Sequence, residues 1–481
     1  MMIRPDACQL ETAWIRDRAL SRAPIDDAVR AVYAYALRLC RCGHIRVGGQ
    51  SVATAPVLGE TREKILDAVW RLADSYHDLE SSKAYSSPGS LAVSAVWQKR
   101  AIVEFYPQMS ALLHEAVARF EAAGIRAHDV EAALREKKLV LALGGGGGTG
   151  FVHLSLFQWL EECGIQPSLI TGTSIGALLG YVRALQDHYD AALTTLKLPG
   201  VWRITRSLRP CLDTTHGLVG LCQIDLTQIF EGISHAFGWT SLPEFHELRI
   251  PFACVASGIV QAPGVRELVE PKRGNGMLQR LLLMTQLGWQ KGIRHASNIA
   301  GLLTSRNAVR AVTFGFDSLT ERMTAVDGIS FSMLVPGVLN YELPHNHYKS
   351  RETLDAIFRR DDLYRLADGG LASNVPVRTA HDAVVEGRIG TENVYMLGVD
   401  VFAPQPTDGL FYPLQKIADS TVHIDARFAD VVVRPDYLLS PMNLAPTLSQ
   451  LHVLNAKFRK SFAPEMTVVQ YALKPLWPLV F

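Results

Sequence analysis

Apolar residues recur at helical spacing through the first 137 residues of the chain. Between residues 61 and 79 they fall close to the i, i+3, i+4, i+7 pattern of an amphipathic helix. Similar patterns occupy residues 25–39 and 109–123, and Gly124 is a plausible stop for the second helix. The pattern therefore predicts a helical N-terminal region over residues 1–137.

After residue 137 the spacing changes to short apolar runs, with helical patterns near residues 155–163 and from residue 175. Strands that alternate with helices predict an α/β domain with a mostly parallel sheet flanked by helices. We assign residues 138–424 to this domain, and residues 425–481, which mix prolines with apolar runs, to a C-terminal extension packed on it. The predicted strands cover residues 139–143, 169–170, 250–255, 311–316 and 394–401.

The first predicted strand leads into a loop, Gly144–Gly150, in which six of seven residues are glycine. A strand, a glycine loop and a helix in this order bring backbone N–H groups to a helix N-terminus, which favours negative charge. Gly145, Gly147 and Gly150 fit the G-x-G-x-x-G spacing of a dinucleotide site, but the next predicted strand ends without an acidic residue. A phosphate-binding P-loop would need a Gly-Lys-Ser/Thr ending, which is missing here. The third interpretation is an oxyanion hole, which needs a nucleophile close by.

A candidate nucleophile follows the next predicted strand. Residues 172–176 have the sequence Gly-Thr-Ser-Ile-Gly and open a helical pattern. G-x-S-x-G at a strand-to-helix turn is the nucleophile elbow, in which small residues allow the tight turn that exposes the serine hydroxyl. Because neighbouring parallel strands end at one edge of a sheet, we expect this turn to meet the glycine loop. Ser174 needs a base, and Asp368, which precedes a glycine pair, could present its carboxylate from a tight turn.

Taken together, these motifs resemble those of the patatin-like phospholipase family. The glycine loop with His153 beyond it is similar to the family's oxyanion-hole block, and residues 172–176 are similar to its nucleophile block. Residues 368–376, which begin Asp-Gly-Gly, resemble its D-G-G block, and residues 330–337 are a weaker match to its small-residue and proline block. The family usually has Arg or Lys just before the last glycine of the loop, whereas this chain has Thr149.

The resemblance implies a patatin-like fold and a Ser–Asp dyad that works without histidine. Ser174 would be the nucleophile and Asp368 its base, and the backbone N–H groups of Gly145, Gly146 and Gly147 would hold the oxyanion. The implied activity is a calcium-independent lipid acyl hydrolase of the phospholipase A or lysophospholipase type, acting on phospholipid or another fatty-acyl ester. No metal or cofactor is implied, and a protein activator stays open. The supporting glycines of the motifs are Gly150, Gly172, Gly176, Gly369 and Gly370.

Several alternatives remain open at this stage. A triacylglycerol lipase or a general carboxylesterase would use the same dyad. A Ser–His–Asp triad of the α/β-hydrolase type would take its histidine from His381, His423 or His452. A non-catalytic module that binds membrane lipid or nucleotide would need neither the nucleophile nor the base.

Charge is balanced overall and uneven locally. The net charge of +1 implies no global attraction to nucleic acid, and we expect no nucleic-acid partner. Residues 271–316 contain no Asp or Glu and interleave seven Lys or Arg with apolar residues and Trp289. This pattern is typical of a helix at a lipid interface, so we expect an insert that associates peripherally with membranes.

Cysteine usage and the N-terminus indicate a cytoplasmic protein. The seven cysteines form no framework, and the first 25 residues contain no apolar signal segment. The sequence has no run of 18 apolar residues, so we expect no transmembrane helix. Two short clusters could hold a metal, residues 40–44 (Cys-Arg-Cys-Gly-His) and the pair His345 and His347, but neither has partner ligands at the spacing of a metal site.

Overall fold

The computed structural model describes most of the chain. The described residues are 6–21, 25–74, 99–197, 207–210, 214–220, 222–261, 265, 294, 297–301, 304, 308–336, 338–405 and 409–479. Most of the predicted basic insert, residues 271–293, lies outside this part of the chain.

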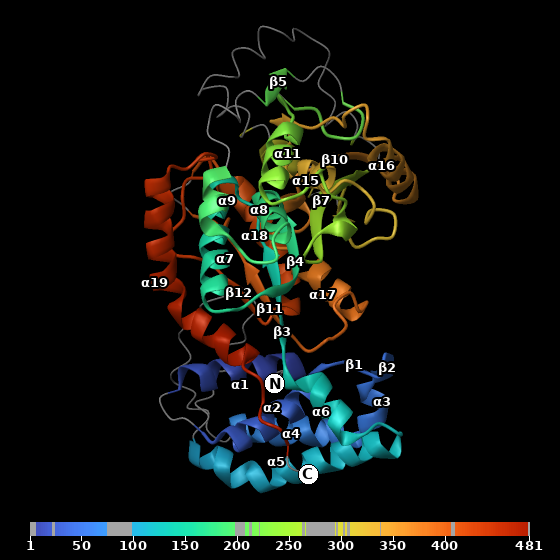
Figure 1. The fold of residues 1–481 in the computed structure, drawn as a ribbon, viewed down its shortest axis with the longest axis vertical. Coiled ribbons are helices and arrows are strands. Elements are labelled where there is room, and N and C mark those ends of the chain that lie inside the picture. Colours follow the sequence, from blue (N-terminus) through green and yellow to red (C-terminus); the bar gives the residue numbers. More distant parts are fainter. Residues whose placement is uncertain are drawn as a thin grey trace.

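The N-terminal region forms a layer of helices at the bottom of Figure 1. Its first helix begins with a capping box, in which Asp6 and Gln9 bond each other's backbone N–H groups. A short hairpin interrupts the helices at a place where the sequence pattern predicts no strand, and Gly48 and Gly49 make its turn with φ of 56° and 83°. The elements are α1 (Ala7–Leu20), α2 (Asp27–Arg41), β1 (His44–Val47), β2 (Gln50–Ala53), α3 (Thr54–Leu58), α4 (Glu60–Asp74), α5 (Lys99–Ala122) and α6 (Ala127–Arg135).

A seven-stranded sheet lies above this layer, with strand order β10-β7-β4-β3-β11-β12 and with β8 also paired to β7. The path from β7 to β12 is parallel, while β8 and β10 run antiparallel to β7, so the predicted mostly parallel α/β fold is confirmed. The end of the predicted insert is β8 and therefore belongs to the sheet. The strands are β3 (Lys138–Leu143), β4 (Pro167–Thr173), β7 (Phe252–Val260), β8 (Val309–Phe314), β10 (Leu363–Ala367), β11 (Val394–Val399) and β12 (Val431–Val433).

Both faces of the sheet are buried, which explains the continuous apolar run of β3. Leu139, Leu141 and Leu143 point into one core with α7 and α8, and Val140 and Ala142 point into the other with α17. Helix α15 also packs on β7 on the first side. The helices are α7 (Val152–Glu162), α8 (Ile175–Ala184), α15 (Ala325–Ser332), α17 (Val377–Val385) and α18 (Tyr412–Asp425).

Two strands share one edge of β7. β4 pairs with its first half, as far as Thr173 opposite Val255, and β10 pairs with its second half, as far as Ala367 opposite Ser257. Because β8 pairs with residues 254–259 and overlaps both, β8 must occupy the other edge. β4 and β10 therefore run toward each other, and the residues that follow them meet near the middle of β7.

Several smaller elements complete the described part of the fold. A second, three-stranded sheet has the order β5-β6-β9. These elements are η1 (Gly147–Phe151), α9 (Ala191–Lys197), β5 (Leu208–Pro210), β6 (Cys222–Ile224), α11 (Thr227–Ala236), η2 (Phe245–Glu247), β9 (Leu339–Asn340), α16 (Tyr348–Arg360), η3 (Gly369–Leu371) and η4 (Ala426–Phe428).

The C-terminal part of the chain returns along the α/β domain to the N-terminal layer. Its long helix, α19 (Leu448–Leu473), packs against α7 and α1, as Figure 1 shows. A capping box between Thr447 and Gln450 begins this helix. No helix in the described ranges combines the length and apolar character needed to cross a bilayer.

A buried ion cluster ties the N-terminal layer to the sheet. Glu11 of α1 accepts hydrogen bonds of 3.0 Å from Lys137, just before β3, and of 3.0 Å from Arg41 of α2. Arg41 also donates to Asp430, just before β12, at 2.8 Å. Burial alone would raise the pKa of Glu11, but Lys137, Arg41 and Arg38 hold it below its ordinary value. Each buried charge thus has a partner of the opposite sign from another element.

Removing one charge from this cluster should be costly. Glu11→Gln leaves the buried Lys137 ammonium without its carboxylate, so we expect the free energy of unfolding to fall by about 3–5 kcal/mol. The same substitution at Glu63, whose side chain is 66% exposed in a pair with Arg62, should change it by no more than about 1 kcal/mol. Urea unfolding of both variants measures the difference, and equal losses would contradict the structural role of the cluster.

Candidate active site

Ser174 lies at the sharp turn between β4 and α8. Its φ of 53° and ψ of −123° place it in a backbone region that residues other than glycine rarely adopt. The flanking glycines allow this turn by close approach. A Cβ on Gly176 would lie 2.2 Å from the carbonyl oxygen of Leu143, and one on Gly172 would lie 2.5 Å from that of Gly176. The two flanking glycines therefore explain how the predicted elbow can form. The strained turn places Ser174 at the end of the sheet.

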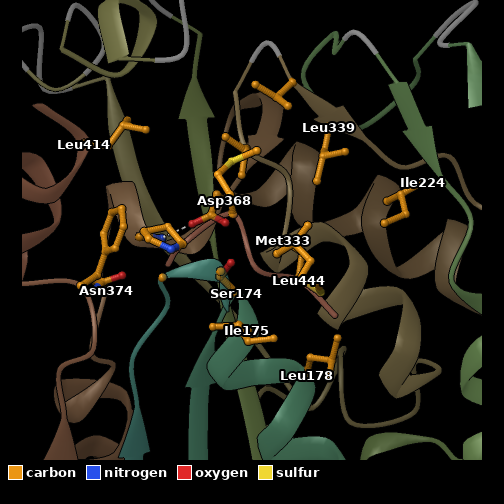
Figure 2. A pocket seen from close by; sticks show the side chains of 18 of the residues that line it. Ser174, Ile175, Leu178, Ile224, Met333, Leu339, Asp368, Asn374, Leu414 and Leu444 are labelled. Carbon is orange, nitrogen blue, oxygen red and sulfur yellow. Dashed lines mark hydrogen bonds between the residues drawn. The ribbon is translucent and has the colours of Figure 1, made fainter. Parts of the chain in front are cut away.

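Asp368 reaches the same point from the opposite direction, at the end of β10. Its Oδ1 accepts the N–H of Gly370 at 2.8 Å, and the Ser174 hydroxyl donates a hydrogen bond to the carboxylate. Figure 2 shows the two side chains pointing toward each other. Position 369 has room only for glycine, because a Cβ there would lie 2.0 Å from the carbonyl oxygen of Val255. The two residues that the sequence analysis paired are thus in direct contact.

The environment of Asp368 changes its acidity. Burial among apolar side chains raises the pKa of the carboxyl to about 6, although the hydrogen bonds from Gly370 and Ser174 oppose the shift. The group is therefore a stronger base than an ordinary aspartate, and it is still ionised at neutral pH.

Some N–H groups of the glycine loop form hydrogen bonds within the protein, and others lie at the cavity. Gly145 donates to the carbonyl oxygen of Asn374 at 3.2 Å and Gly148 to that of Pro441 at 2.8 Å, so both groups are used within the protein. Gly146 and Gly147 line the cavity beside Ser174, and no hydrogen bond from either N–H occurs within the described residues. Of the three predicted oxyanion donors, the geometry thus favours Gly146 and Gly147 over Gly145.

Two buried side chains hold this loop in shape. The Nε2–H of His153 donates to the carbonyl oxygen of Gly144 at 3.0 Å, and burial lowers the pKa of this histidine to about 4, so the ring is neutral. Thr149, which stands where the family usually has a basic residue, donates from its hydroxyl to the carbonyl oxygen of Gly146 at 2.9 Å. The loop therefore has an internal hydrogen bond at the position where the resemblance implies a basic residue.

Ser174 and Asp368 open into a cavity of about 220 Å³ with largely apolar walls. Asp368 is the only charged residue among the described residues that line it. Figure 2 shows the wall extending from Ser174 toward Ile224 and Leu178. The sequence analysis missed these wall residues, because apolar side chains from separate segments carry no motif. They include Leu178, Ile224, Leu226, Ile229, Phe230, Ile233, Met333, Val338, Leu339, Phe402, Phe411, Leu414, Pro441, Met442 and Leu444.

The other candidate residues lie away from the cavity. His381 and His423 are half exposed beside Asp382 and Asp419, and His452 is exposed on α19. None of the three is among the described residues that line the cavity.

Several residues of the two short clusters considered as metal sites are either bonded to other groups or protonated. His347 donates to the buried carboxylate of Asp327 at 2.9 Å, while His345 is exposed. Burial raises the pKa of Cys40 to about 12 and that of Cys42 to about 11, which keeps both thiols protonated.

The raised pKa of Asp368 implies a pH-dependent stability. Between pH of about 4, where an unfolded aspartate titrates, and about 6, the folded state binds more protons than the unfolded state. Wild-type stability therefore falls as pH rises through this window, by at most about 3 kcal/mol. Asp368→Asn has no charge to bury, so its stability relative to wild type should increase from pH 4 to pH 8. Urea unfolding at both pH values tests this, and an unchanged difference would contradict the assigned environment.

Comparison with known proteins places this site in a family. A family model described as patatin-like phospholipase matches residues 141–381, half of the chain. Patatin-like phospholipase domain-containing protein 6 from Homo sapiens is 35% identical over 85 residues, which are 17% of this chain and 6% of that protein. Lysophospholipase NTE1 from Mycosarcoma maydis is 26% identical over 219 residues, which are 42% of this chain and 11% of that protein. The matches thus span only a small part of these relatives. The family match covers the glycine loop, the elbow, the Asp-Gly-Gly turn and the strands β4, β7, β8 and β10, while β11 and β12 lie beyond it. The chain belongs to the patatin-like phospholipase family.

Proposed function

We propose that this protein is a lipid acyl hydrolase of the phospholipase A or lysophospholipase type, with Ser174 as nucleophile and Asp368 as base. The observation that carries the proposal is the hydrogen bond from the Ser174 hydroxyl to the Asp368 carboxylate at the wall of an apolar cavity. The fungal relatives named lysophospholipases support the substrate class.

The chemistry follows from the positions of the groups. The Ser174 oxygen attacks the acyl carbonyl carbon while its proton passes to Asp368. The oxyanion accepts hydrogen bonds from the N–H groups of Gly146 and Gly147, each worth about 3–4 kcal/mol in a preorganised site. Protonated Asp368 then returns the proton to the leaving alcohol oxygen. Water attacks the acyl-enzyme by the same route and releases the fatty acid.

The pKa of Asp368 makes a dyad without histidine workable. A base with a pKa of about 6 accepts the serine proton more readily than an ordinary aspartate with a pKa near 4. The carboxylate needs no other ionisable group to be oriented, since the Gly370 N–H holds one oxygen at 2.8 Å.

The cavity walls suit an acyl chain. Burial of each methylene against such walls contributes about 0.8 kcal/mol, so a long chain provides most of the binding energy. Because Asp368 is the only charged residue among the described lining residues, the walls also suit neutral esters. A triacylglycerol lipase or a general carboxylesterase is therefore the second candidate. Peripheral membrane association and the absence of a calcium requirement remain predictions of the proposal.

The dyad is tested by hydrolysis of a short-chain p-nitrophenyl ester and of phospholipid vesicles in EDTA. Ser174→Ala and Asp368→Asn should each lower kcat/KM by at least roughly 10³-fold, because each removes a reacting group. His381→Ala is the control and should keep wild-type activity, since that side chain is not among the described residues that line the cavity. Wild-type activity in Ser174→Ala, or a loss in EDTA that calcium restores, would overturn the proposal.

Acyl-chain length is tested by filling the cavity at its far wall. Ile224→Trp should reduce the hydrolysis of long-chain p-nitrophenyl esters by roughly 10-fold or more, because the larger side chain displaces several methylenes. It should leave the hydrolysis of the acetyl ester nearly unchanged, and Ile224→Ala should spare both substrates. A parallel loss on both esters would show that the acyl chain binds elsewhere.

A further inference from the structure

Two strands that share an edge of a third leave a gap where they meet. Along one edge of β7, β4 ends opposite Val255 and β10 ends opposite Ser257, so Ala256 between them has a strand partner only in β8. Backbone groups at such a buried gap cannot reach water and must find other partners. Ser174 and Asp368 are the first residues beyond the two strand ends.

On the Ser174 side, a buried hydroxyl closes the gap. Ser332, the last residue of α15, is fully buried. Its Oγ accepts the backbone N–H of Ser174 at 2.9 Å and donates its own proton to the carbonyl oxygen of Val255 at 2.5 Å. One side chain therefore links the nucleophile's backbone to the strand on which both halves of the dyad rest.

On the Asp368 side, the arrangement is similar. The hydroxyl of Ser257, also fully buried, donates to the carbonyl oxygen of Asp368 at 2.7 Å. The N–H of Asp368 donates to the carbonyl oxygen of Leu334 at 2.7 Å, two residues beyond Ser332. The end of α15 thus holds the backbones of both dyad residues.

Helix α15 is itself firmly anchored. Its buried Asp327 accepts hydrogen bonds from the Tyr341 hydroxyl at 2.6 Å and from His347 at 2.9 Å. Ile329 and Phe331 pack in the main core. Ser332 and Leu334, which bond the backbones of Ser174 and Asp368, therefore lie at the end of a well-anchored helix.

We propose that Ser332 is a positioning residue for the Ser174–Asp368 dyad, with Ser257 as its counterpart on the Asp368 side. The inference rests on the proposed function. The backbone of Ser174 is strained, and a strained conformation persists only where the surroundings over-determine it. The Ser332 hydroxyl supplies one of those constraints, and its loss would leave the N–H of Ser174 and the carbonyl of Val255 without this partner.

The experiment compares Ser332→Ala with Ser330→Ala, a matched control on the same helix. Ser330 is equally buried, but its hydroxyl donates only to Val326 of its own helix, at 2.7 Å. Ser332→Ala should lower kcat on a p-nitrophenyl ester by roughly 10- to 100-fold with little change in KM, because the reacting atoms lose their alignment. Ser257→Ala should act in the same direction, and Ser330→Ala should keep the wild-type kcat.

The pH profile separates positioning from a general loss of structure. The hydrogen bond from Ser174 lowers the pKa of Asp368, so a misaligned serine should move the acid limb of kcat/KM to higher pH. This shift should occur in Ser332→Ala and be absent in Ser330→Ala.

Two results would overturn the inference, and they differ in what else they overturn. If Ser332→Ala loses no more activity than Ser330→Ala while Ser174→Ala is inactive, Ser332 has no positioning role and the proposed function stands. If Ser174→Ala is as active as wild type, the proposed function fails, and the inference fails with it.

Discussion

The edge of β7 is the constraint on which the site depends. A single edge accommodates the end of a parallel strand and the end of an antiparallel strand only if the two approach each other, and the loops that leave them must then occupy the same small space. Ser174 and Asp368, although far apart in sequence, are brought into contact by this arrangement. The glycines at both turns follow from it, because neither chain could pass so close to β7 or β3 with a side chain at Gly369 or Gly176.

The rest of the molecule excludes water from the site of Ser174 and Asp368 and holds the surrounding segments in place. Apolar walls remove water from Asp368, which raises its pKa and makes it a better base at a cost in stability. The C-terminal segment contributes to the same site, since Pro441 accepts the N–H of Gly148 and lines the cavity. That segment is also joined to the N-terminal layer, through the contact of α19 with α1 and through the hydrogen bond from Arg41 to Asp430. The region outside the family match therefore supports the site rather than only adjoining it.

The sequence predicted the parts of this arrangement that local chemistry determines. The fold class and the elements around the glycine loop follow from the change of apolar period at residue 138, and the elbow and the D-G-G turn need specific residues in order. The sequence could not predict that β10 is antiparallel and shares an edge with β4, because strand direction depends on long-range pairing. It also could not show that Gly145 donates to Asn374, or that Ser332 bonds Ser174, since a buried serine carries no local signal of its partner. The hairpin of β1 and β2 was missed because a four-residue strand in a helical region has too short a pattern.

The most direct test of the central claim is to locate the acyl group on the enzyme. Wild-type protein can be reacted with a long-chain fluorophosphonate, which mimics the acyl substrate, and the modified peptide identified by mass spectrometry. The account predicts one adduct, on Ser174, that forms much more slowly in Asp368→Asn. An adduct on another residue, or equal labelling of Ser174 without the Asp368 carboxylate, would contradict it.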